Sequence, residues 1–134
     1  MNKIKTLKTI TFSLILLIIT SCSKDDNNSS TNEKTIKYEI TGNYSGQLLV
    51  IYNDNVSGNT TVTVSSLPWS KTINYPSNVL GIGIGGNGIV GKLGTAGQTV
   101  SVKIYNGTTV LKSGSATADA NGAITLSTLA HVFQ

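Results

Sequence analysis

The feature that most constrains the fold is a succession of short β-type segments, separated by glycine and asparagine, that fills the chain after residue 34. Ile36, Tyr38 and Ile40 alternate with polar residues, which is the pattern of a half-buried strand. No stretch after residue 22 has the repeat of an amphipathic helix. We therefore predict an all-β fold: a single small immunoglobulin-like β-sandwich of about seven or eight antiparallel strands.

The strands and turns of this sandwich can be placed from local composition. Residues 47–52 and 60–66 are apolar or β-branched and predict strands. Residues 53–59, rich in asparagine, aspartate and glycine, predict a loop. The segment 67–69 contains a proline, which lacks the N–H that a central ladder needs, and predicts a bend before a strand over 69–75.

The dipeptide Asn106-Gly107 predicts a β-hairpin, because Asn-Gly favours the type I′ turn, in which both central residues have positive φ. A two-residue loop there makes Val102 face Leu111. The apolar residues of the two strands then share one face: Val100, Val102, Ile104 and Leu111.

The N-terminal segment has the organisation of a secretory signal. Lysines in residues 1–9 precede the apolar stretch 10–19, which is about half of the ~20 residues that a membrane-spanning helix needs. Ile19-Thr20-Ser21-Cys22 resembles the lipobox of bacterial lipoproteins. The resemblance implies cleavage before Cys22 and a diacylglycerol anchor on its sulfur. The alternative is an ordinary signal peptide followed by an incidental cysteine.

The residues behind this cysteine suggest a destination. Ser23-Lys24-Asp25-Asp26 is similar to the surface-export signal of Bacteroidetes lipoproteins, which implies display on the outer face of the outer membrane. Alternatively, these residues only begin a solvated polar tether. The expected organisation is a signal peptide (1–21), a lipidated cysteine with its polar tether (22–34) and one β-sandwich domain (35–134).

The basic character of the chain belongs mainly to the segment that is removed. Of ten lysines, Lys3, Lys5 and Lys8 precede the cleavage site, which leaves seven against six acidic residues. Arginine is absent, so the planar fork that suits phosphates is missing. We expect no nucleic-acid partner. The single cysteine leaves no internal disulfide.

Residues 81–97 are rich in glycine, and Gly81 to Gly86 literally satisfy the dinucleotide motif G-x-G-x-x-G. A dinucleotide site also needs a helix to start at the third glycine, and the following residues cannot start one. We expect strands over 80–84 and 89–93, with glycines at bulges, turns or close backbone contacts. A looser, mobile hairpin is the alternative.

Neither catalysis nor metal binding is indicated. His131 is the only histidine, and beyond the tether the acids are Glu39, Asp54 and Asp119, so a triad would have to draw on these residues. One histidine without a free cysteine excludes ordinary zinc sites. We expect no enzyme activity and no cofactor.

Two further features allow a functional and a structural interpretation. Residues 119–122 resemble half of a calcium loop, but a tight turn leading to a last strand over 123–127 is favoured. Trp69 is expected in the core rather than as an exposed recognition aromatic. Four tyrosines could form a binding face if their strands expose them together: Tyr44, Tyr52, Tyr75 and Tyr105.

Three segments, 38–42, 67–71 and 100–105, occur in matching order in small Bacteroidetes lipoproteins that look related to the mycobacterial small membrane proteins called MmpS. The resemblance implies an immunoglobulin-like sandwich outside the cytoplasmic membrane. In the mycobacterial relatives it also implies an accessory role beside lipid-exporting transporters. Those relatives are usually anchored by a transmembrane helix, and the glycine-rich stretch 81–97 departs from the family pattern.

The expected function is that of a lipid-anchored lipoprotein of the outer-membrane surface, a non-enzymatic binding or structural module with a protein or glycan partner. The alternative is a periplasm-facing accessory subunit of an envelope lipid or transport system.

Overall fold

The computed structural model describes residues 34–134, which form strands and no helix. The eight strands are β1 (Lys34–Gly42), β2 (Leu48–Asp54), β3 (Gly58–Val64), β4 (Trp69–Tyr75), β5 (Gly81–Gly88), β6 (Thr99–Asn106), β7 (Thr109–Thr117) and β8 (Leu129–Val132). All paired strands are antiparallel. The predicted all-β sandwich is confirmed.

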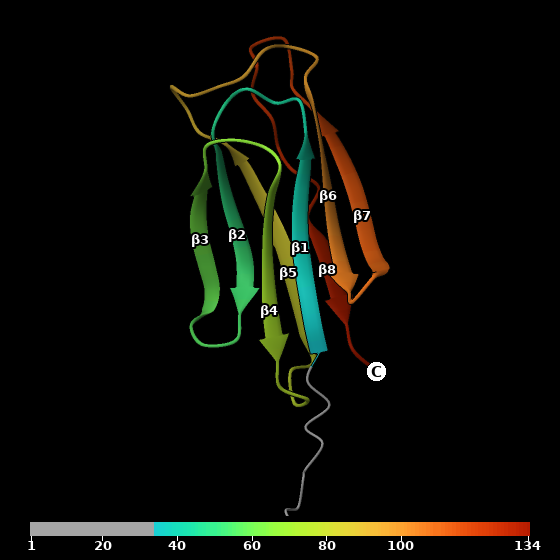
Figure 1. The fold of residues 1–134 in the computed structure, drawn as a ribbon. Helices are drawn as coiled ribbons and strands as arrows, with labels where there is room; N and C mark the ends of the chain where they lie inside the picture. Colours follow the sequence, from blue (N-terminus) through green and yellow to red (C-terminus); the bar gives the residue numbers. More distant parts are fainter. Residues whose placement is uncertain (1–33) are drawn as a thin grey trace, which may run out of the picture.

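Two four-stranded sheets face each other (Figure 1). Sheet I has the order β4-β1-β6-β7, and sheet II has the order β3-β2-β5-β8. β1 pairs with β4 in one sheet and β2 with β5 in the other, as strands B with E and C with F do in immunoglobulin domains. The β6–β7 hairpin extends sheet I beside β1, and β8 extends sheet II beside β5.

The core lies between the sheets and is built by every second residue of the central strands. Ile36, Tyr38 and Ile40 of β1 are fully buried, as are Val50 of β2 and Val102 of β6. Each large aliphatic side chain that is buried contributes about 1.5–3 kcal/mol. The alternation predicted for β1 is therefore confirmed, and it supplies the packing that holds the domain together.

The β6–β7 hairpin forms, but the predicted turn is wrong. Asn106 is the last residue of β6 and pairs with Thr109, so the loop is Gly107-Thr108. Asn106 does not adopt positive φ; Gly107 does, at +58°. Glycine with positive φ at the first loop position is typical of a type II′ turn. The Gly107 N–H also donates to the Thr35 carbonyl on β1, at 3.2 Å.

The predicted register of this hairpin is wrong as well. Val102 faces Gly114 rather than Leu111, because the loop lies one residue later than predicted, which moves the partner by two residues, and the pairing shifts by one more between Ile104 and Tyr105. The shift leaves Leu111 as the extra residue of a β-bulge on β7. Leu111 is nevertheless partly buried and packs against the core.

Three further expectations need correction. The predicted last strand over 123–127 is absent apart from an isolated bridge of Thr125 to Asn87, and β8 follows it instead. The second glycine-rich strand, 89–93, does not form, and β5 is the only strand there. The loop predicted over 53–59 is shorter, because β2 extends to Asp54 and β3 begins at Gly58.

The chain enters the sandwich at the same end at which it leaves it (Figure 1). There the Lys34 ammonium donates hydrogen bonds to the carbonyls of Ser77 and Val79, at 3.0 and 2.9 Å. It also lies 4.0 Å from the centroid of the Phe133 ring. Lys34 thus ties the start of β1 to the β4–β5 loop and to the C-terminal residues.

Candidate functional site

The outer face of sheet II carries a hollow whose floor is made of glycine. Ile82 and Ile84 of β5 point into the core. The alternate positions Gly81, Gly83 and Gly85 therefore face outward and present only backbone. β5 lies between β2 and β8, so the missing side chains leave a trough between two strands. The hollow has a volume of about 410 Å³.

Side chains of the neighbouring strands form the walls of this hollow. Ile51 of β2 pairs with Gly85 and is 43% exposed. At one end, Asn53 Nδ2 donates to Asn59 Oδ1 at 2.7 Å, which fixes both amides. On the other side, Thr128 lies against the floor, because a Cβ added at Gly85 would be 3.2 Å from its hydroxyl oxygen. The walls are therefore aliphatic, amide and hydroxyl groups.

None of the residues that line the hollow carries a charge. By contrast, the outer face of sheet I presents Lys37, Glu39 and Lys103. Neutral amides and hydroxyls can both donate and accept hydrogen bonds, whereas an apolar floor favours contact with uncharged surface. The hollow is thus suited to an uncharged ligand or partner.

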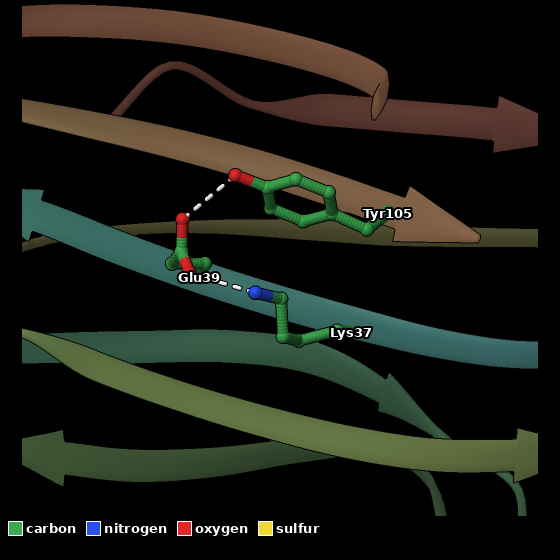
Figure 2. Close-up of polar contacts among 3 residues, drawn as sticks. All are labelled: Lys37, Glu39 and Tyr105. Carbon is green, nitrogen blue, oxygen red and sulfur yellow. Dashed lines mark hydrogen bonds and ion pairs between the residues drawn. The ribbon is translucent and has the colours of Figure 1, made fainter. Parts of the chain in front are cut away.

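Two charged residues of sheet I, Lys37 and Glu39, form a compact cluster with Tyr105 that Figure 2 shows. Lys37 Nζ lies 2.8 Å from Glu39 Oε2, and the Tyr105 hydroxyl donates to Glu39 Oε1 at 2.8 Å. The Lys37 ammonium also lies 4.2 Å from the centroid of the Tyr105 ring. Strand register explains the cluster, because Lys37 is paired with Tyr105 and Glu39 with Lys103.

The hydrogen bond from Tyr105 to Glu39 connects β6 to β1 within this cluster, and the cluster changes the pKa values of its own members. The hydrogen bond from Lys37, and after it that from Tyr105, lowers the pKa of Glu39 from its ordinary value. The bond with Glu39 in turn raises the pKa of Lys37. A general base works best with a pKa near the operating pH, and Glu39 is shifted away from it.

His131, the candidate base, lies half-buried on β8, and its ring packs edge-on against Phe133 with centroids 4.9 Å apart. It borders an open hollow of about 700 Å³ at the end where the chain enters, together with Lys34 and Lys112. The three acidic side chains accept hydrogen bonds from other groups. Glu39 accepts one from Tyr105, and Asp54 accepts one from the Val56 N–H. Asp119 accepts hydrogen bonds from backbone N–H groups of its own turn. Within residues 34–134, no group of three metal-ligating side chains gathers.

Residues 119–122 form the tight turn that the sequence favours. The Asp119 carboxylate accepts hydrogen bonds from the N–H groups of Asn121 and Ala123, at 2.8 and 2.9 Å. The Gly122 N–H donates to the Asp119 carbonyl. The Oδ1 atom of Asp119 thus stabilises the turn itself.

The tyrosines do not form an exposed face. Tyr44, Tyr52 and Tyr75 are buried, and Tyr105 belongs to the cluster on sheet I. Trp69 is half-buried and packs against the core, with its ring centroid 5.9 Å from that of Tyr52. Trp69 is thus partly buried against the core, in agreement with the expectation that it is not a free recognition aromatic.

The hollow on sheet II was not predicted from the sequence, although a sequence pattern that indicates it is present. In Gly81-Ile82-Gly83-Ile84-Gly85 the isoleucines alternate with glycines, which predicts a strand with one apolar face and one bare face. The glycines were expected at bulges, turns or close backbone contacts, and the last is confirmed at Gly86, where an added Cβ would lie 2.3 Å from the Leu49 carbonyl oxygen. Most of the glycines lie within strand β5 rather than in turns, and the segment that matches the dinucleotide motif is strand throughout.

The predicted lipidation site, Cys22, and the predicted sorting residues, Ser23, Lys24, Asp25 and Asp26, lie outside the described residues. Within residues 34–134 no helix is long and apolar enough to span a membrane. No family model, curated protein or solved structure matches the chain.

Proposed function

We propose that the chain is a lipoprotein of the bacterial envelope, anchored through Cys22 and displayed on the outer-membrane surface, whose sandwich is a non-enzymatic binding module. The observation that carries the binding role is the uncharged, glycine-floored hollow on sheet II. Glycine in the interior of a strand often marks the close approach of a ligand or of another backbone. An uncharged protein segment or glycan fits such a surface.

The arrangement of the chain supports this proposal. β1 starts at Lys34, directly after the polar segment that follows Cys22, so only a short stretch separates the anchor from the domain. The hollow lies on the side of the sandwich, over β2, β5 and β8, rather than at the end where the chain enters. A domain tethered by that end keeps this face free for a partner.

A charge placed in the hollow tests the binding role. In Ile51→Lys, an exposed aliphatic residue of the wall becomes an ammonium group that an uncharged partner does not compensate. The matched control is Val110→Lys, which alters an equally exposed aliphatic residue of sheet I, 47% against 43%. Cross-linking on intact cells followed by capture should recover the same partner with the wild type and Val110→Lys but not with Ile51→Lys. Equal recovery with all three would mean that the hollow is not the binding site.

Two measurements test the location. Cys22→Ser should remove the lipid and release the protein from the membrane fraction, and retention there would refute the anchor. Protease added to intact cells should degrade the wild type. Protection until the outer membrane is opened would favour the periplasm-facing accessory role that the likeness to the MmpS proteins implies.

A further inference from the structure

The four edge strands of the sandwich differ in how they are protected against pairing with another chain. Exposed edges are normally blunted by lysine, proline, bulges, shortness or a covering segment. β4 carries Lys71 and lies between Pro68 and Pro76. The side chain of Asn55 also donates to the Asn74 carbonyl near its end. This edge is therefore protected.

The edges formed by β7 and β8 are protected too. β7 contains Lys112 and the bulge at Leu111. The Ser127 hydroxyl of the following segment also donates to the Ser115 carbonyl of β7, at 2.9 Å. β8 has only four residues, Leu129–Val132. Neither strand offers a long, regular edge.

β3 has none of these protective features. Its seven residues, Gly58–Val64, include no charge and no proline, and its pairing with β2 is continuous, without a bulge. Among residues 34–134, its backbone pairs with that of no strand except β2. Figure 1 shows β3 at the outer side of sheet II with no strand beyond it.

From this difference we infer that β3 is a dimerisation edge, which pairs antiparallel with β3 of a second copy to join two copies of sheet II into one eight-stranded sheet. The inference does not depend on the proposed anchoring or on the hollow. An unprotected regular edge is a ready template for strand addition, and three protected edges direct such pairing to the fourth.

The sequence of β3 is compatible with pairing to itself. Around a two-fold axis, side chains on the same face of the sheet lie opposite one another. With the axis at Val62, Thr61 faces Thr63 of the second copy; with the axis at Thr61, Thr61 faces its own equivalent. Either arrangement sets no like charges against each other. Val62, which is half-buried against the core, would also be covered further.

Antiparallel pairing places the starts of the two β1 strands at opposite ends of the dimer. The 12 residues from 22 to 33 span at most about 40 Å, and the nine residues of β1 about 30 Å. The tether of the inverted copy therefore reaches past the length of its sheet. Dimerisation through β3 is compatible with anchoring both copies in one membrane.

Charge substitution at the edge tests the dimer. The full chain, purified in detergent, is examined by sedimentation velocity as the wild type and with Thr61→Lys plus Thr63→Lys. Both positions are exposed, so the added charges should destabilise the dimer without disturbing the fold of the monomer. The wild type should be dimeric and the lysine variant monomeric, a halving of the protein mass. The matched control, Ser115→Lys plus Thr117→Lys on β7, should remain dimeric.

A complementary variant separates pairing from misfolding. Thr61→Glu plus Thr63→Glu should also be monomeric alone, and mixing it with the lysine variant should restore a dimer, because opposite charges then face each other. A monomeric wild type would overturn the inference. A wild-type dimer that persists in both charged variants, or a mixture that stays monomeric, would also overturn the assignment to β3.

Discussion

The hydroxyl oxygens of Tyr38 and Tyr75 lie 2.9 Å apart inside the core, on the neighbouring strands β1 and β4. The Tyr75 hydroxyl donates to the carbonyl of Asn53 in sheet II, so the proton between the two tyrosines comes from Tyr38. The ring of Tyr38 packs on that of Tyr52, with centroids 5.5 Å apart. A short chain of hydrogen bonds therefore joins the two sheets within an otherwise apolar core.

Because of this direction of donation, the two tyrosine hydroxyls should contribute unequally to stability. Tyr75→Phe removes the donor to Asn53 and the acceptor for Tyr38, and should lower the free energy of unfolding by about 1–3 kcal/mol. Tyr38→Phe leaves the bond to Asn53 intact and should cost about 1 kcal/mol or less. Urea unfolding, followed by the fluorescence of Trp69, measures both. A larger loss in Tyr38→Phe would reverse the assigned direction.

The same pair makes stability depend on alkaline pH. Burial raises the pKa of Tyr38 and of Tyr75 above the ordinary value. The unfolded chain loses its tyrosine protons near about pH 10, where the folded protein still holds them. The unfolded state then binds fewer protons, so the free energy of unfolding is intact below about pH 10 and falls as pH rises beyond it.

Urea unfolding at successive alkaline pH values tests this dependence. The variant that combines Tyr38→Phe and Tyr75→Phe starts from lower stability at neutral pH but should lose less on going to alkaline pH, because the two shifted groups are gone. Parallel losses in the wild type and the variant would show that other groups carry the alkaline dependence.

Much of the fold could be predicted because alternation in β1 and β6 reports directly which side chains are buried. The register of the β6–β7 hairpin could not. The preference of Asn106-Gly107 for a type I′ turn is local, whereas in the fold the Gly107 N–H bonds to Thr35 on β1. A contact from a strand distant in sequence thus outweighs the local preference.

The candidate site was still harder to predict from the sequence, because it is formed by the pairing of segments that are distant in the chain. The hollow needs Gly83 and Gly85 to lie between Ile51 of β2 and Thr128. The alternation of isoleucine and glycine shows that β5 has a bare face, but only the order of strands in sheet II shows what borders it. For the same reason the burial of Tyr52 and Tyr75 became evident only from the assembled sheets.

The cluster on sheet I should contribute little to stability despite its good geometry. Lys37 and Glu39 are partly exposed, at 36% and 24%, so solvent screens their attraction. Glu39→Gln should therefore shift the urea midpoint much less than Tyr75→Phe. Because the pKa of Glu39 is lowered, its contribution is present above the ordinary glutamate pKa and is lost as pH falls through the lowered value.

Unfolding of the wild type and Glu39→Gln between about pH 3 and about pH 7 checks this sign. The two curves should differ slightly at neutral pH and converge at acid pH, and added salt should also reduce the difference. If Glu39→Gln lowered the free energy of unfolding as much as Tyr75→Phe does, the cluster would be a principal stabilising feature.

Two glycines with similar positive φ provide a test of packing at the loop end of the sandwich. Gly91 and Gly122 have φ of +82° and +76°, a region that side chains enter at a cost of about 1–2 kcal/mol. A Cβ on Gly91 meets nothing within 4 Å, whereas one on Gly122 would lie 2.0 Å from the Gly94 carbonyl oxygen. In Gly91→Ala the free energy of unfolding should fall only by this conformational cost. In Gly122→Ala it should fall by about 3 kcal/mol or more.

The excess in Gly122→Ala should come from displaced backbone and from the hydrogen bond that the Tyr44 hydroxyl donates to the Gly122 carbonyl, at 3.0 Å. Tyr44→Phe removes that bond without adding a methyl group and should account for about 1 kcal/mol of the difference. Urea unfolding of the three variants separates the contributions. Equal losses in Gly91→Ala and Gly122→Ala would mean that the turn at 119–122 shifts freely away from Gly94, so that close contact between these loops does not hold the end of the sandwich together.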